Sequence, residues 1–211
     1  MNDKKVKIGI MGGTFNPPHL GHLISAEASL KQLSLDKVIF IPTGRISYKV
    51  ISENVSAFDR YNMVKLIIKD NPLFEISDIE TKKNDFSYTF ETLKSLKKIY
   101  KDAELYFLVG GDSLDYMDKW KMPEEIFSMC TVAVFSRDGF SIEAIEKKIK
   151  SLEDRFNAKI LIIKRPDIDI SSTDLRRKIR EGDNVKQEVT EDVLKYIVQN
   201  NLYLGDNNDG D

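Results

Sequence analysis

The chain has 211 residues and a formal net charge of −2, with 41% hydrophobic and 31% charged residues. This length favours one domain with a substantial core, and the balance of apolar and charged residues is typical of a soluble globular protein. Because there is no basic excess, a general nucleic-acid binder is disfavoured. The single cysteine, Cys130, cannot build a disulfide framework or a thiolate metal site by itself.

The beginning of the chain, MNDKKVKIGIMGG, lacks the apolar stretch of a signal peptide. No apolar run approaches the roughly 18 residues that a membrane-spanning helix needs. We therefore expect a cytoplasmic protein without a membrane partner.

Short β-branched apolar runs alternate along the chain with amphipathic stretches, a pattern typical of strands alternating with helices. Strands are expected at residues 6–11, 37–42, 73–76, 104–109, 131–135 and 160–163. Helices are expected at residues 20–33, 56–68, 88–100, 142–156, 171–181 and 190–200. Because the strands are continuously apolar, we predict a doubly wound, Rossmann-like α/β fold whose parallel sheet is covered on both faces. It forms a single domain over residues 1–204, followed by a disordered acidic tail at 205–211.

Sheets of this kind bind ligands beyond the carboxyl ends of their strands. The segment GGTFNPPHLGH, residues 12–22, follows the first predicted strand and contains both histidines of the chain, His19 and His22. Gly12 and Gly13 let backbone N–H groups approach a phosphate. The histidines, three residues apart, share one face at the start of a helix, where anions are favoured. We therefore predict an anion-binding site here.

Three common ligand-binding motifs do not fit this segment. It matches neither G-x-x-x-x-G-K-[ST] nor G-x-G-x-x-G, so a P-loop kinase and a dinucleotide-binding dehydrogenase are disfavoured. It contains no H-E-x-x-H pattern and no third ligand nearby, so a zinc site is disfavoured and no dedicated protein metal site is expected.

A second polar segment, ISSTDLR at residues 170–176, opens an amphipathic helix. The hydroxyls of Ser171, Ser172 and Thr173 lie beside free helical N–H groups, and Arg176 follows within the first turn. Such a group suits a phosphate, which Arg binds in a bidentate manner. Ordinary helix capping is the alternative, although it needs only one of the three hydroxyls.

The two segments resemble the (H/T)-x-G-H and I-S-S-T-x-I-R signatures of the nucleotidylyltransferase superfamily, in its bacterial nicotinate-nucleotide adenylyltransferase form. Three further segments are similar to that family: SYT at 87–89, GGDSL at 110–114 followed by Trp120, and SRDG at 136–139. The resemblance extends over residues 5–204. It implies transfer of the adenylyl group of ATP, with Mg²⁺ arriving with ATP, to nicotinate mononucleotide.

The resemblance also implies roles for individual residues. Catalytic roles fall on His19, His22, Arg176 and Lys49. Contacts with ATP fall on Gly12, Gly13, Thr14, Phe15, Gly110, Asp112, Ser171, Ser172 and Thr173. Contacts with the acceptor fall on Tyr88, Thr89, Trp120 and Arg137. In the family, the S-Y-T backbone receives the nicotinate carboxylate, the Trp stacks on the pyridine ring and the Arg holds a phosphate.

One departure affects the expected chemistry. The family often has P-P-H-K after the second strand, whereas this chain has ISYK at 46–49, so Tyr48 replaces a histidine and cannot carry a positive charge near neutral pH. Two alternatives stay open: an adenylyltransferase for nicotinamide mononucleotide or phosphopantetheine, and a nucleotide-binding sensor without turnover. The sequence leaves open whether the protein is a homo-oligomer.

Overall fold

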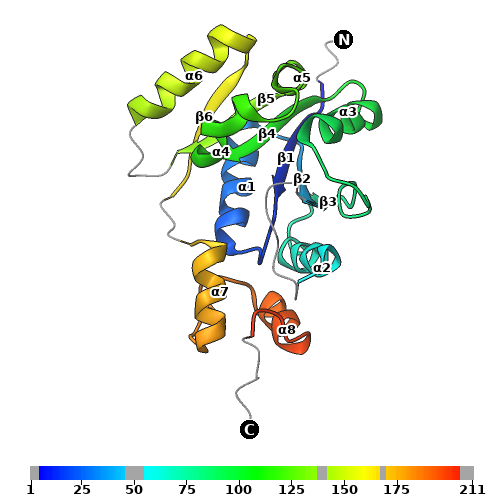
Figure 1. The fold of residues 1–211 in the computed structure, drawn as a ribbon, viewed down its shortest axis with the longest axis vertical. Coiled ribbons are helices and arrows are strands. Elements are labelled where there is room, and N and C mark those ends of the chain that lie inside the picture. The colour runs from blue at the N-terminus through cyan, green and yellow to red at the C-terminus, as the bar shows by residue number, and fades with distance from the viewer. Residues whose placement is uncertain (1–4, 46–54, 137–141, 167–169, 205–211) are drawn as a thin grey trace.

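The computed structural model describes residues 5–45, 55–136, 142–166 and 170–204. Within these residues, six parallel strands form one sheet in the order β3-β2-β1-β4-β5-β6 (Figure 1). The strands are β1 (Lys7–Gly13), β2 (Lys37–Pro42), β3 (Phe74–Ile76), β4 (Glu104–Gly110), β5 (Thr131–Ser136) and β6 (Ile160–Lys164). Because the order runs outward in both directions from β1 and β4, the winding of the sheet reverses between these two strands. The predicted doubly wound, Rossmann-like fold is confirmed.

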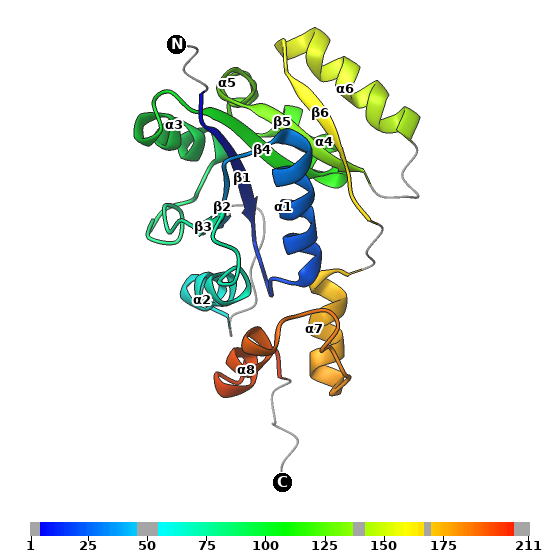
Figure 2. The same ribbon diagram turned by 180° about the vertical axis from the view of Figure 1, so that it is seen from behind.

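Helices cover both faces of the sheet. They are α1 (Leu20–Leu33), α2 (Ala57–Ile67), α3 (Thr89–Ile99), α4 (Gly111–Tyr116), the 3₁₀ helix η1 (Met117–Lys119), α5 (Pro123–Met129), α6 (Ile142–Phe156), α7 (Ser172–Glu181) and α8 (Glu191–Gln199). Helix α1 lies in front of the sheet when the molecule is seen from behind, whereas α3, α4 and α5 lie on the opposite side (Figures 1 and 2).

Alternation along the strands explains how the sheet supports two cores. In β1, Ile8 and Ile10 belong to a buried cluster with α3, α5 and α6, whereas Met11 belongs to a second cluster with α1 and α2. In β2, Ile39 and Phe40 divide in the same way. Successive side chains of a strand point to opposite faces, so a continuously apolar strand serves both layers.

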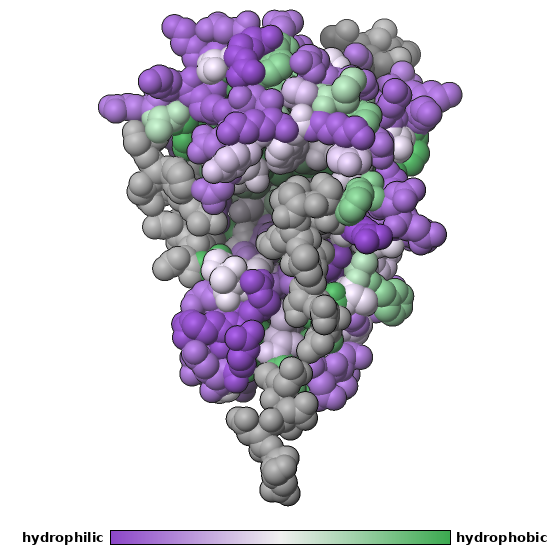
Figure 3. All heavy atoms as spheres, viewed as in Figure 1, coloured by the Kyte–Doolittle hydropathy of each residue, from purple (hydrophilic) through white to green (hydrophobic). Residues whose placement is uncertain are grey.

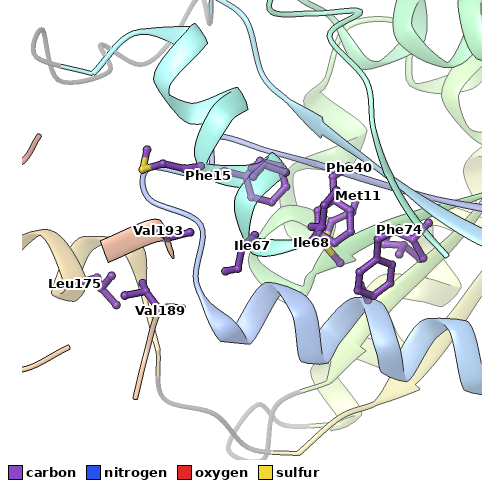
Figure 4. Close-up of a cluster of buried hydrophobic side chains, with 14 of the residues drawn as sticks. Met11, Phe15, Phe40, Ile67, Ile68, Phe74, Leu175, Val189 and Val193 are labelled. Carbon is purple, nitrogen blue, oxygen red and sulfur yellow. The ribbon is translucent and has the colours of Figure 1, made fainter. Parts of the chain in front are cut away.

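The second cluster extends from the sheet to the C-terminal helices α7 and α8. Figure 4 shows Phe15 and Phe40 on the sheet side of this cluster, and Leu175, Val189 and Val193 near α7 and α8. Its members come from segments far apart in the sequence, so apolar packing in this cluster holds the C-terminal helices against the rest of the domain. The outer surface over α7 is hydrophilic, and hydrophilic side chains cover most of the coloured part of this face of the molecule (Figure 3).

The sequence predicts the long elements well and misses three short ones. The helices at 20–33 and 142–156 and the strand at 37–42 have the predicted bounds, and the other predicted elements differ by one or two residues at their ends. No element was predicted between 111 and 129, where α4, η1 and α5 lie. These helices have six, three and seven residues, too few for a helical period to emerge.

Candidate active site

Two adjoining cavities lie at the carboxyl ends of β1 and β4, where the winding of the sheet reverses. The larger has a volume of about 580 Å³, and the smaller about 310 Å³. Gly12, Phe107, Ser113 and Trp120 line both, so these residues form the boundary between the cavities. Ligands in the two cavities would meet at this boundary, which makes the pair suited to joining two molecules.

Both histidines line the wall of the smaller cavity at the N-terminus of α1. His19 is the N-cap residue of α1 and is 8% exposed. The Nδ1 atom of His22 accepts a hydrogen bond from the backbone N–H of His19 at 3.1 Å. The two rings lie 3.8 Å apart between centroids, and the ring of Phe15 contacts His22 edge-on at 4.9 Å. The predicted pairing of the histidines on one face is therefore present.

The environment of His22 determines its charge and tautomer. Burial of the imidazole, assisted by the positive charge of Arg165, lowers the pKa of His22 from 6.5 to about 4. The ring is consequently neutral at physiological pH. Since Nδ1 accepts the His19 N–H, the ring proton resides on Nε2. His22 is thus a neutral hydrogen-bond donor through Nε2.

The residue before His22 is a glycine, Gly21, because the His19 ring leaves no room for a side chain there. A Cβ atom at this position would lie 2.9 Å from Nδ1 of His19 and 3.1 Å from its Cε1, closer than ordinary packing allows. The imidazole of His19 therefore packs directly on the backbone of Gly21. The x-G-H part of the motif has a steric reason here.

The end of β1 and the loop that follows it place their residues in two different environments. Gly12, Gly13 and Thr14 line the larger cavity, and Gly12 also lines the smaller one. Phe15, expected to contact ATP, is 2% exposed, adopts a left-handed φ of 49° and packs in the core, so its side chain lines neither cavity. Only the backbone of Phe15 remains available for the predicted ATP contact.

Hydrogen bonds from the ISSTDLR segment hold the loop after β1 in position. Ser171 caps α7, its side chain accepting the N–H of Asp174, and Ser172 Oγ donates to the Pro17 carbonyl at 2.8 Å. Arg176 Nη1 donates to the carbonyl oxygens of Asn16 at 2.7 Å and Ser172 at 3.1 Å.

Only part of this segment reaches a cavity. Ser171 and Ser172 line the smaller cavity, whereas Thr173 and Arg176 line neither. Thr173 Oγ1 instead accepts a hydrogen bond from Arg176 Nη2 at 3.2 Å. The structure therefore brings two of the three predicted hydroxyls to the candidate site.

Only some residues of the GGDSL segment at the end of β4 line a cavity. Gly110 lines the smaller cavity and Ser113 lines both, but Asp112 is exposed in the first turn of α4 and lines neither. Lys49 and Arg137, predicted for catalysis and acceptor binding, lie outside the described residues, as does Tyr48.

The larger cavity contains the remaining predicted acceptor residues. Tyr88, the N-cap residue of α3, and Thr89, its first residue, line one part of the wall. Trp120 lines another part, and Phe107 supports it in a T-shaped contact with ring centroids 6.1 Å apart. The cavity thus combines an aromatic side chain with a helix N-terminus, an arrangement suited to a flat ring bearing an anionic group.

Five charged residues near the cavities were not predicted. Arg165, directly after β6, lines the smaller cavity, whereas Glu80, Lys119 and Lys121 line the larger one. Arg60 is 1% exposed and donates from Nη1 to Thr14 O at 2.8 Å and from Nη2 to Thr43 O at 2.6 Å. The position of Arg165 after a strand was a usable sequence signal, but Glu80 and Arg60 reach the site only through tertiary packing.

The donor set of the smaller cavity suits anions. It includes histidine and serine side chains and the Arg165 guanidinium, which match phosphate oxygens. Within the described ranges, no three His, Cys, Asp or Glu side chains gather to hold a metal ion. In the same ranges, no helix is both long and apolar enough to span a membrane.

Several known proteins are similar to this chain. A family model described as cytidylyltransferase-like matches residues 10–178. A protein of Lachnoclostridium phytofermentans named "Probable nicotinate-nucleotide adenylyltransferase" is 39% identical over 198 residues, covering 94% of this chain and 99% of the relative. A Clostridium novyi protein with the same name is 43% identical over 197 residues, covering 93% of this chain and 98% of the relative.

A solved structure described as "Plasmodium falciparum nicotinic acid mononucleotide adenylyltransferase complexed with NaAD" has the same fold. Its TM-score is 0.77 at 22% identity, over 94% of this chain and 97% of that chain. The sequence matches extend over nearly all of this chain and its relatives. The chain therefore belongs to the cytidylyltransferase-like family and, within it, to the nicotinate-nucleotide adenylyltransferases.

Proposed function

We propose that this chain transfers the adenylyl group of ATP to nicotinate mononucleotide, forming deamido-NAD and releasing pyrophosphate. The observation that carries the proposal is the pair of cavities that meet at Gly12 and Trp120. The smaller one is lined by donors for phosphate oxygens, and the larger one by groups suited to a pyridine carboxylate. The names of the relatives support the same pair of substrates.

The ATP side of the reaction is assigned to the smaller cavity. His22 would donate from Nε2 to the α-phosphate, with His19, Ser172 and Arg165 adding further donors around the triphosphate. Since His22 is neutral, it offers a fixed hydrogen bond rather than a titrating charge. Arg176 holds the loop through Asn16, and its positive charge favours the polyphosphate at the same end of the sheet.

The acceptor side is assigned to the larger cavity. The pyridine ring would stack on Trp120, whose orientation is supported by Phe107. The carboxylate would face the N-terminus of α3 at Tyr88 and Thr89, where backbone N–H groups and the helix dipole favour an anion. A carboxylate only accepts hydrogen bonds, so it suits a wall of N–H donors. The amide of the nicotinamide form presents N–H donors of its own, which these backbone donors cannot accept.

The chemistry follows from bringing the two ligands together. A phosphate oxygen of the mononucleotide attacks the α-phosphorus of ATP in line, a new P–O bond forms, and the bond to the β-phosphate oxygen breaks. Pyrophosphate leaves with the electron pair, so no covalent intermediate with the protein is needed. Catalysis is positioning plus stabilisation of charge on the α-phosphate and leaving group. Mg²⁺, bound to ATP through phosphate oxygens and water, would neutralise part of that charge.

The proposal is tested by measuring pyrophosphate release with ATP and Mg²⁺ and one of three acceptors: nicotinate mononucleotide, nicotinamide mononucleotide or phosphopantetheine. Preference for the nicotinate form supports both the reaction and the assignment of the larger cavity. Release with another acceptor would retain the chemistry and refute that assignment. Thermal stabilisation by ATP without release from any acceptor would indicate a nucleotide-binding sensor instead.

A further inference from the structure

The larger cavity carries a positive charge beside the proposed carboxylate site. Lys121 lines this cavity, and its Nζ lies 3.9 Å from the centroid of the Tyr88 ring. It also lies 5.8 Å from the ring of Phe90 on α3. An ammonium over aromatic faces is attracted by their negative electrostatic potential, so the contact holds the charge near the N-terminus of α3.

Two carboxylates on the helices that adjoin the Tyr88–Lys121 contact are paired with other lysines. Within the described part of the chain, Glu91 pairs with Lys83 at 3.2 Å, Glu125 pairs with Lys94 at 3.8 Å, and no ion pair engages Lys121. Glu91 lies on α3, which begins directly after Tyr88, and Glu125 lies on α5, which begins two residues after Lys121. The ammonium is therefore available to an anionic ligand in the cavity.

Among the described residues, Glu80 is the one acidic residue that lines the same cavity. Its side chain is buried, at 7% exposure, and Oε1 accepts a hydrogen bond from Thr92 Oγ1 at 2.7 Å. Burial raises the pKa of the Glu80 carboxyl, and the nearby positive charges are those of Lys83 and Arg60. Lys119, which also lines the cavity, holds its Nζ 5.3 Å from the ring of Tyr116, a largely exposed residue on α4. Lys121 is thus the cation placed at Tyr88.

We infer that Lys121 is a specificity-determining residue that selects the carboxylate of nicotinate mononucleotide over the amide of nicotinamide mononucleotide. The inference rests on the proposed function, because it concerns the acceptor cavity of that reaction. An ammonium attracts a carboxylate in a partly enclosed cavity, whereas it gains little from a neutral amide. Selection then comes from a charge as well as from the backbone donors of α3.

Binding measured without turnover tests this inference. Trp120 is the only tryptophan of the chain and lines the cavity, so its fluorescence reports occupancy. Each mononucleotide would be titrated without ATP into the wild-type protein and into Lys121→Met, Lys121→Arg and Lys98→Met. Lys98→Met removes the same charge from the last turn of α3, about 13 Å along the helix from Thr89 and beyond the screening length at physiological salt.

We expect Lys121→Met to weaken binding of nicotinate mononucleotide about fivefold and to leave nicotinamide mononucleotide within about twofold. Lys121→Arg should retain the preference, and Lys98→Met should behave as wild type. In steady-state kinetics, Lys121→Met should raise KM for the nicotinate form with little change in kcat, the pattern of lost ground-state binding. High salt should reduce the wild-type preference more than that of Lys121→Met.

Equal weakening for both mononucleotides would overturn the inference, because Lys121 would then serve only to pack on Tyr88. An unchanged ratio of the two affinities would overturn it as well. Failure of the proposed function would give a different result: the wild type would bind the mononucleotides without releasing pyrophosphate. The ratio of the two affinities, measured by Trp120 fluorescence, would still decide the role of Lys121. A wild-type protein that binds neither mononucleotide would contradict both.

Discussion

Acidification is expected to leave the imidazole of His22 uncharged far below the pH at which ordinary histidines become protonated. The pKa of His22 is lowered from 6.5 to about 4, chiefly by burial. At pH 6.5 an ordinary histidine is half protonated, whereas about one His22 in 300 would carry a second proton. The donor that faces the smaller cavity therefore stays a neutral Nε2–H group throughout the physiological range.

The same pKa difference has a consequence for stability. The folded state binds fewer protons than the unfolded state between pH 6.5 and about 4, so the free energy of unfolding rises with pH in this window. The contribution of His22 is fully present above pH 6.5 and is lost as the pH falls toward 4. The difference corresponds to about 3 kcal/mol at 1.36 kcal/mol per pH unit.

Nitrogen NMR of the imidazole rings provides the assay, because the chain has only two histidines and His19→Gln leaves a single signal pair. We expect an unprotonated Nδ1 and a protonated Nε2 at neutral pH, with no titration until the pH approaches 4. A midpoint near 6.5, or a proton on Nδ1, would refute the description of His22 as a neutral Nε2 donor. The matching functional variant, His22→Ala, should lower kcat about 100-fold or more, and near-normal turnover would refute its role.

Further substitutions test the loop after β1, the histidine contact and the acceptor cavity. Arg60→Met should leave the carbonyls of two loops without donors and lower the free energy of unfolding by about 3 kcal/mol, seen as a fall in Tm of about 6–12 °C. The control substitution at an exposed arginine, Arg177→Met, should leave Tm nearly unchanged. Equal shifts in Tm for the two variants would contradict this reasoning. Gly21→Ala should displace His19 and lower kcat while circular dichroism reports an intact fold, and wild-type kcat would argue against the steric role of Gly21. Trp120→Leu should raise KM for nicotinate mononucleotide about tenfold in initial-rate measurements, whereas an unchanged KM would remove Trp120 from the acceptor site.

The fold was predictable where the sequence pattern is long and local. The helix at residues 20–33 has leucines at helical spacing (Leu20, Leu23, Leu30 and Leu33), and the strand at 37–42 is apolar after Lys37, so both were found with their observed bounds. The segment 111–129 was not, because its short helices are held by tertiary packing rather than by a period of their own.

The candidate site likewise combines residues that a local sequence pattern predicts with residues that only tertiary packing brings in. The histidine pair could be found because its three-residue spacing and the preceding glycines are local features. The core position of the Phe15 side chain could not be found, because a left-handed φ and contacts with Phe40 depend on the folded loop. Arg60 reaches the site from α2, and no sequence spacing connects it to the loop it holds. Lys121 directly follows Trp120 in the sequence, but its position over the Tyr88 ring depends on tertiary packing.

The most direct test of adenylyl transfer follows the α-phosphate itself. ATP labelled in its α-phosphate would be incubated with the protein, Mg²⁺ and nicotinate mononucleotide, and the products separated. We predict that the label moves into deamido-NAD, that unlabelled pyrophosphate forms in equal amount, and that His22→Ala suppresses both. Label that stays in ATP, or that is released as AMP without a dinucleotide, would contradict adenylyl transfer to this acceptor.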